Sequence, residues 1–447
     1  MNSKILALDT EKIPKLLFKY SLPAIISMTA ASLYNMVDSI FIGRGVGALA
    51  ISGLAITLPV MNLASAFGAL VGVGASTLVS VKLGQRDYVT ANQAFGNAIT
   101  LNCIIGVVFT ALGLIFMDSV LRFFGASDQT LPYAREYMQI IVVGNIITHV
   151  YFGMNDNLRA SGYPRKAMMA TLTAVGVNCL LDPLFIFVFK WGIRGAAIAT
   201  VLSQAIALSV VIRHYARPDS VLHFQKGNFK LRKGMPKNIF SVGLAPFLLN
   251  VCNCCIVIII NRSFYHYGGD YAVGAYGIVN RLMFFVVMIV LGFNQGMQPL
   301  VGFNYGAKAY ARVVRIFRLT LWCAVTVTTL GFLAAHLFPY KIVGLFTTHQ
   351  ELTELAVKGL RIATLMFPLV GAPMVIASFF QAIRKPGRAI FLSLTRQVIF
   401  LIPLLLTLPH FWGINGVWSS LPLSDCISVL VATILVTKQI KSFNKTL

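Results

Sequence analysis

The sequence predicts an all-α integral membrane protein whose twelve transmembrane helices form two six-helix lobes, related by a parallel pseudo-two-fold repeat. Of its 447 residues, 57% are hydrophobic and only 11% are charged, which is less than half the charged fraction usual in soluble domains. Apolar runs long enough to cross a bilayer recur from Leu16 to Val436. A water-soluble core cannot absorb that much apolar surface, which excludes a soluble enzyme and a secreted domain.

Twelve apolar windows, interrupted by glycine, proline and charged residues, are the predicted spans. Each has about 20 residues or more, the length that an α-helix needs to cross the hydrocarbon core. We place them at 16–43, 48–81, 92–117, 131–158, 166–189, 193–213, 238–262, 272–303, 316–338, 352–382, 389–409 and 413–437.

Positive charges lie between these windows. Lys and Arg number 37 against 14 Asp and Glu, a net charge of +23, but no basic domain stands outside the apolar windows, so we expect no nucleic-acid partner. Connections on one side of the predicted membrane carry 26 Lys and Arg, and those on the other side carry six. This bias places both termini in the cytoplasm, in agreement with an even number of spans.

An internal repeat divides the chain into halves. The longest connection, polar and basic, predicts a cytoplasmic linker over 215–237, between an N-lobe at 1–214 and a C-lobe at 238–447. Landmarks recur across it at an offset of 221–222 residues: Gly84, Tyr88, Pro164, Gly192 and Gly195 reappear as Gly306, Tyr310, Pro386, Gly413 and Gly416. Halves of six helices share one orientation, and such parallel repeats are typical of transporters with the substrate path between them.

Few acids lie deep inside the predicted spans, and two of them fall at a similar depth. Asp38 lies in the outer half of the first helix, and Asp182 lies roughly 12 Å below the outer end of the fifth. Thr200 on the sixth helix has about the depth of Asp182, and Asn178 is one turn away on the same face. These four side chains therefore form the candidate cation site.

Three roles for this group remain open from the residues alone. Carboxylate, amide and hydroxyl oxygens suit a hard cation such as Na⁺. Alternatively the acids could take up protons, because burial and mutual repulsion favour their neutral form. The third possibility is a pair of buried acids with a purely structural role. The repeat supplies no second copy, since Asp182 shifted by 221 residues falls on Pro403 and Asp38 shifted by 222 falls on Ile260.

Six short motifs occur in order along the chain, at 34–43 (YNMVDSIFIG), 158–164 (LRASGYP), 181–186 (LDPLFI), 195–200 (GAAIAT), 298–306 (QPLVGFNYG) and 413–418 (GINGVW). Together they resemble the MATE (multidrug and toxic compound extrusion) transporters, particularly the bacterial MepA-type branch. The similarity covers nearly the whole chain.

The resemblance implies two six-helix lobes and export of amphipathic, often cationic drugs against a gradient of H⁺ or Na⁺. Its cation site maps onto Asp38, Asn178, Asp182 and Thr200, the group that helix depth also selects. Residues matching the family's N-lobe cavity are Tyr34, Tyr137 and Asn155, and the C-lobe offers Gln295 and Asn294 in place of acids. We therefore expect a multi-pass protein of the bacterial inner membrane that acts as a monomer on small molecules and confers resistance to antibiotics.

An alternative within the same superfamily is a flippase for lipid-linked precursors, which would favour a strongly cationic cavity. Its candidate residues are Arg281, Arg361 and Arg396, which two acids oppose. An enzyme is not expected, because no nucleophile–base set, zinc spacing or phosphate-binding loop occurs, and we expect neither a cofactor nor a structural metal.

Arg396 and Asp425 lie roughly 12 and 18 Å deep from the cytoplasmic ends of their helices. An unpaired charge there is costly, so we expect the two to form an ion pair or to share a polar cavity.

The charge bias predicts that the Arg213–Lys237 connection faces the cytoplasm. Fusion of a reporter active only in the cytoplasm should give signal at this connection and at the C-terminus, and none between residues 262 and 272. An impermeant thiol reagent that labels a cysteine placed in the connection on intact cells would contradict both the orientation and the even number of spans.

Overall fold

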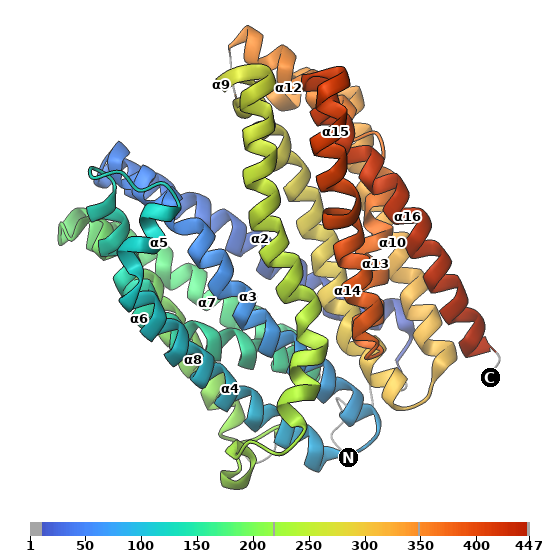
Figure 1. Cartoon of the computed structure of the whole chain (residues 1–447). Coiled ribbons are helices and arrows are strands. Elements are labelled where there is room, and N and C mark those ends of the chain that lie inside the picture. Colours follow the sequence, from blue (N-terminus) through green and yellow to red (C-terminus); the bar gives the residue numbers. More distant parts are fainter. Residues whose placement is uncertain (1–10, 218–219, 347–348, 445–447) are drawn as a thin grey trace. The chain divides into compact units, whose positions relative to one another are not determined.

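The computed structural model describes residues 11–217, 220–346 and 349–444, and every regular element within them is a helix (Figure 1). The first half contains α2 (Ile13–Gly45), α3 (Ala48–Gly84), α4 (Tyr88–Ile115), α5 (Met117–Phe123), α6 (Leu131–Ala160), α7 (Pro164–Pro183), the π-helical η1 (Leu184–Val188), α8 (Gly192–Tyr215) and the short 3₁₀ helix η2 (Lys226–Phe229). The second contains α9 (Met235–Gly306), α10 (Tyr310–Leu337), α11 (Pro339–Gly344), α12 (Gln350–Ala363), α13 (Phe367–Ala382), α14 (Pro386–Leu394), the π-helical η3 (Thr395–Leu401), α15 (Ile402–Trp412) and α16 (Ile414–Asn444).

Within these residues, ten helical segments are long and apolar enough to cross a membrane, and the bent pair α12 and α13 makes eleven. The segment Pro386–Phe443 is counted once among them, yet it is interrupted at Gly413, whose φ of 53° no helix continues. Dividing it there gives twelve spans, so the predicted twelve-helix architecture agrees with the structure.

Three predicted helices are less regular than their sequences suggest. The helix predicted over 352–382 is two helices bent by 56°, because Pro368 at the start of α13 lacks an N–H and disfavours helical backbone before it. The helices predicted over 166–189 and 389–409 each contain a π-helical stretch, η1 and η3. Such stretches are frequent at functional sites.

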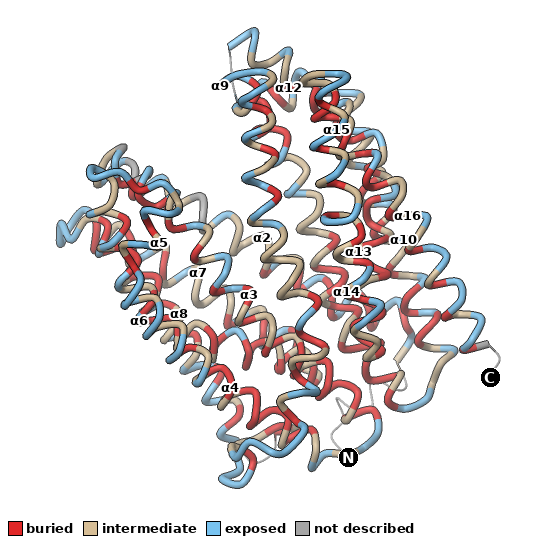
Figure 2. Tube along the Cα trace, in the orientation of Figure 1, coloured by how far each residue is buried: buried red, intermediate tan, exposed pale blue. Residues whose placement is uncertain are grey.

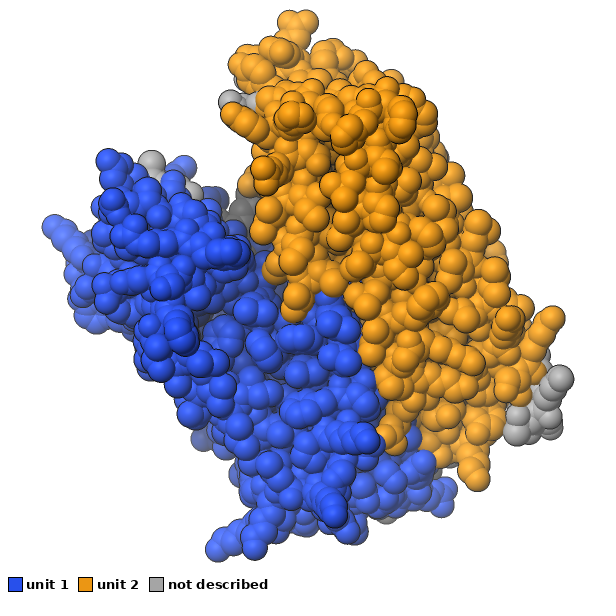
Figure 3. Space-filling model, in the orientation of Figure 1, with its two compact units in different colours: residues 1–10, 26–250 blue, residues 11–25, 251–447 orange. Residues whose placement is uncertain are grey.

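Two compact units are present, coloured separately in Figure 3. Among the described residues, unit 1 comprises Ile26–Asn250, and unit 2 comprises Glu11–Ile25 and everything from Val251 onward. The first residues of α2 thus belong to unit 2, and the first residues of α9 belong to unit 1. The predicted domain bounds follow the repeat whereas the units follow packing, and the two differ at these segments.

Helix α6 is the central helix of unit 1. It packs against α3, α4, α7 and α8, and its most apolar window is half buried, more than that of any other apolar span described. Buried residues follow much of its length (Figure 2).

The basic connection before α9 packs against α4 of unit 1. The Asn97 amide on α4 donates to the carbonyls of Asn228 and Lys230 at 2.9 and 3.0 Å and accepts from the Arg232 N–H at 3.0 Å. Gly96 permits this approach, because a Cβ there would lie 2.4 Å from the Asn228 carbonyl oxygen.

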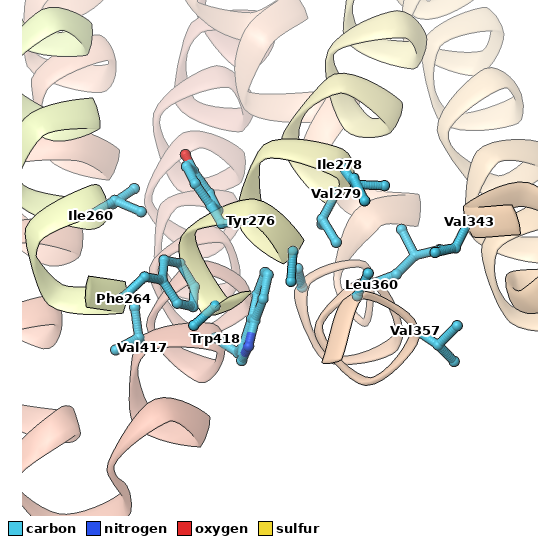
Figure 4. Packing of buried hydrophobic residues seen from close by; sticks show 14 of the residues in the cluster. Ile260, Phe264, Tyr276, Ile278, Val279, Val343, Val357, Leu360, Val417 and Trp418 are labelled. Carbon is cyan, nitrogen blue, oxygen red and sulfur yellow. The ribbon is translucent and has the colours of Figure 1, made fainter. Parts of the chain in front are cut away.

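The core of unit 2 includes a cluster of aromatic and branched side chains from α9, α12 and α16 (Figure 4). Trp418 on α16, 2% exposed, packs on Phe264 with ring centroids 4.4 Å apart and on Tyr276 at 6.2 Å. Gly359 on α12 lies directly against this indole, and an ideal Cβ there would come within 2.3 Å of a ring carbon.

We expect Gly359→Ala to destabilise the protein by about 1–3 kcal/mol, because the enclosed indole cannot move away from an added methyl group. The measurement is the thermal unfolding midpoint of purified protein in detergent. Gly277→Ala on α9 is the matched control, since no atom lies within 4 Å of its added Cβ. An unchanged midpoint in Gly359→Ala would show that the cluster is loosely packed.

Candidate functional site

The four residues predicted to bind a cation lie together in unit 1, contributed by three helices. Asp38 comes from α2, Asn178 and Asp182 come from α7, and Thr200 comes from α8. All four side chains are buried, with exposed fractions between 0 and 5%. Helix depth alone was enough to predict that these four residues lie together. The role of this group in ion binding stays a prediction.

Asn178 connects α7 and α8. Its amide lies 2.7 Å from Oδ2 of Asp182 and 3.2 Å from the backbone nitrogen of Thr200. The orientation that satisfies both has the Asn178 NH₂ donating to Asp182 and its carbonyl oxygen accepting from the Thr200 N–H. This amide therefore fixes the position of one carboxyl group.

The carboxyl groups of Asp38 and Asp182 are close enough to interact electrostatically. Oδ1 of each is buried and has no hydrogen-bond partner. Two buried carboxylate ions next to each other repel, which favours the uptake of a proton or another cation. The pair is therefore suited to holding a positive charge.

Two tyrosines complete the surroundings of this pair. The Tyr34 hydroxyl lies 3.1 Å from Oγ1 of Thr200, and Tyr137, only 1% exposed, lies near the same threonine and the two acids. We predicted both as cavity residues, but the structure joins them to the cation group. Sequence reasoning missed this because it gives the depth of a residue along its helix but not the direction in which its ring points.

The π-helical η1 begins two residues after Asp182. The sequence contains a sign of it in Pro183, which cannot donate a backbone hydrogen bond and so disturbs the regular ladder. This local irregularity lies beside the carboxyl pair.

Asn155 lies apart from this group. It is buried near the end of α6 and donates to Oγ1 of Thr171 at 3.1 Å, about two turns before Asn178 on α7. Its carbonyl oxygen has no partner. The structure therefore does not bring Asn155 together with the other predicted N-lobe residues.

Unit 2 holds the predicted neutral polar residues on α9. Asn294 is 3% exposed and neither of its amide atoms has a hydrogen-bond partner, and Oε1 of Gln295 is likewise buried and unpartnered. Buried amides without partners are costly. These two side chains are therefore available to a ligand.

The predicted ion pair between Arg396 and Asp425 is confirmed. Nε of Arg396 lies 2.5 Å from Oδ1 of Asp425. Sequence reasoning missed their neighbours Gln397 and Asn253, which are joined at 2.5 Å.

Apolar spans, duplicated halves and a carboxyl pair in the interior define this chain as a polytopic membrane transporter. A model of the MatE family matches it twice, at residues 23–184 and 246–407. The chain belongs to the MATE family of multidrug efflux transporters. The two matches begin 223 residues apart, which confirms the internal repeat.

Relatives of known name match over nearly their whole length. The multidrug export protein MepA of Staphylococcus haemolyticus (strain JCSC1435) is 30% identical over 433 residues, which are 96% of this chain and 94% of that protein. MepA of Staphylococcus aureus (strain MSSA476) is 28% identical over 428 residues, 95% and 94% of the two chains. A solved structure described as the outward-facing conformation of a multidrug resistance MATE family transporter matches with a TM-score of 0.93 and 23% identity, covering 100% of this chain and 99% of that one.

We expect Asn178→Leu to lower the stability of unit 1 by about 1–3 kcal/mol, because Asp182 loses its donor and the Thr200 N–H loses its acceptor. Thermal unfolding in detergent measures the effect, with Met169→Leu at an exposed position of α7 as control. In a double-mutant cycle with Asp182→Asn, the two losses should deviate from additivity by at least about 0.5 kcal/mol. Strict additivity would contradict the contact.

Proposed function

We propose that the chain is a secondary active antiporter that exports amphipathic, often cationic drugs in exchange for H⁺ or Na⁺. The observation that carries this proposal is the facing pair of buried carboxyl groups, Asp38 and Asp182, with Asn178 and Thr200 beside them. The name multidrug export protein, borne by relatives of nearly equal length, supports the drug substrate.

The donor set fits a small monovalent cation. Oδ1 of Asp38 and Oδ1 of Asp182 are unpartnered acceptors, and Thr200 Oγ1 and the Asn178 amide lie next to them. A proton would bridge the two carboxyl groups, whereas Na⁺ would draw on all four side chains as oxygen ligands. The gradient of whichever ion binds would supply the driving force.

Coupling follows because the site with a bound ion and the empty site favour different arrangements of the helices. An ion drives transport only if it stabilises one conformation more than another. When the ion leaves, Asp38 and Asp182 would repel each other, so the helices α2 and α7 that carry them would be favoured in another arrangement. The loaded site would hold them together as described above.

The proposed setting is the bacterial inner membrane, with both termini in the cytoplasm and a single chain as the working unit. The flippase alternative gains no support, because the cationic Arg396 is neutralised by Asp425. Arg396 therefore does not provide the strongly positive interior that a lipid-linked precursor would favour.

The test is dye efflux from proteoliposomes under separately imposed Na⁺ and H⁺ gradients. Asp38→Asn and Asp182→Asn should each reduce gradient-driven efflux to the background rate while expression and membrane insertion stay normal, because an amide neither takes up a proton nor carries the negative charge that holds Na⁺. Asp128→Asn is the control, since that side chain is 88% exposed on the surface. Wild-type rates in both interior variants would show that coupling resides elsewhere.

A change of Gln295 should alter which drugs are carried without abolishing coupling, because this amide belongs to unit 2 whereas the carboxyl pair belongs to unit 1. The same assay with several dyes measures the change.

A further inference from the structure

Unit 2 contains an ion pair in its interior that the proposed coupling site does not use. Arg396 lies in the π-helical η3 and Asp425 lies in α16. The Asp425 side chain is 3% exposed, whereas that of Arg396 is 32% exposed. The carboxylate is thus enclosed and the guanidinium is partly accessible.

Polar residues adjoin this pair along the chain, and one of them contacts α9. Gln397, the neighbour of Arg396, donates to Oδ1 of Asn253 on α9. Ser428 lies three residues after Asp425, on the same face of α16. Oε1 of Gln397 and Oγ of Ser428 are buried and have no hydrogen-bond partner. The two residues are 8% and 0% exposed, respectively.

This cluster is expensive for a structural element. Hydrophobic side chains of similar volume are often as stabilising as a buried ion pair, or more so, and each unpartnered buried polar atom adds a further cost. Charged and polar residues inside spans usually serve function. The π-helical turn that presents Arg396 also departs from the hydrogen bonding of a regular helix.

The accessible side of the cluster is polar. Asn253 is exposed although it stands near the middle of the span Met235–Gly269, about 27 Å along the helix from Met235. An exposed amide at that depth is unfavourable against lipid. The face that carries Asn253 and Arg396 is therefore suited to water or a polar ligand.

Arginine has donors left after pairing with Asp425. A guanidinium offers five N–H groups in a planar fork, and the bond to Asp425 is made by Nε. The two terminal nitrogens match the two oxygens of a carboxylate. Asp425 holds the plane of the fork, and the pair as a whole carries no net charge to repel a cationic group elsewhere on the same ligand.

We propose that the guanidinium of Arg396 binds the carboxylate of zwitterionic amphiphilic substrates, with Asp425 as the positioning residue. The proposal rests on the proposed export function and names the residue that would recognise one chemical group of such substrates. Cationic substrates without a carboxylate would be transported without this contact.

The test uses a matched pair of probes, a rhodamine with a free carboxylate and the ethyl ester of the same dye. Both carry the cationic ring system, and they differ only in the group that Arg396 would bind. Efflux of each is measured from proteoliposomes under the gradient that drives the wild type. Equilibrium binding of each to the purified protein is measured in parallel by fluorescence anisotropy.

Arg396→Gln should weaken binding and efflux of the free acid at least about tenfold, the effect expected when a charge-assisted hydrogen bond is lost. The ester should change less than about twofold, because it cannot form a bond to a guanidinium that depends on negative charge. Arg396→Lys keeps the charge but loses the fork, so it should recover part of the acid binding. Arg361→Gln, at an exposed position of α12, should leave both dyes unchanged.

Asp425→Asn removes the anchor of Arg396 and also the charge that balances it. The uncompensated guanidinium should repel the cationic ester, whereas it still attracts the carboxylate of the acid, so the two dyes should lose binding by different factors. Equal losses for acid and ester in Arg396→Gln, Arg396→Lys and Asp425→Asn would overturn the proposal in favour of a structural pair. Unchanged acid binding in Arg396→Gln would overturn it as well.

The proposed function can fail independently. If the wild type exports neither dye under either gradient, the export proposal fails, while anisotropy still decides whether Arg396 binds the free acid. If the wild type exports and binds only the ester, the carboxylate site is wrong and the export proposal stands.

Discussion

Two carboxyl groups held against each other in an apolar helix bundle cannot both remain charged without a cation between them. Asp38 and Asp182 are in that position, and most features of unit 1 can be related to it. Burial removes the water that would screen their repulsion, the Asn178 amide fixes one of them, and the hydroxyl groups of Tyr34 and Thr200 close the polar surroundings. We therefore propose that an ion stabilises this site, which is the property that a coupled transporter requires.

The repeat explains the architecture of the chain but not the distribution of its chemistry. The family model matches both halves, and both halves contain a π-helical stretch in the fifth span of their bundle. Yet the counterparts of the two acids are Pro403 and Ile260, and Ile260 is buried at 3% exposure in the aromatic cluster of unit 2. Duplication preserved the helix packing, while the polar groups of each half occupy different positions.

The sequence was sufficient for those parts of the structure that depend on periodicity and depth. Span lengths follow from the bilayer thickness, and depth along the helices predicted that Asp38, Asn178, Asp182 and Thr200 lie together. The cost of an isolated charge predicted the partner of Arg396. None of these arguments needs to know which way a side chain points.

What the sequence left open depends on local backbone geometry and on packing between distant segments. Asn155 matches a family position, yet on α6 it faces Thr171 and not the acids. The bend between α12 and α13 and the π-helical turns arise where proline or packing interrupts the hydrogen-bond ladder, which periodicity does not resolve. The exchange of the first residues of α2 and α9 between the units is likewise invisible in a pattern of hydrophobic residues.

The two interior polar groups differ in how their charge is balanced, and this difference determines what each can bind. The acids of unit 1 form no ion pair with a basic residue in the described part of the chain, and we propose that a mobile cation balances their charge. Arg396 and Asp425 balance each other, so their cluster needs no ion and can be approached by a neutral or zwitterionic ligand. A ligand carboxylate gains the free donors of the guanidinium without having to displace Asp425. Separate sites of this kind allow a substrate to be recognised without competing for the groups that bind the driving ion.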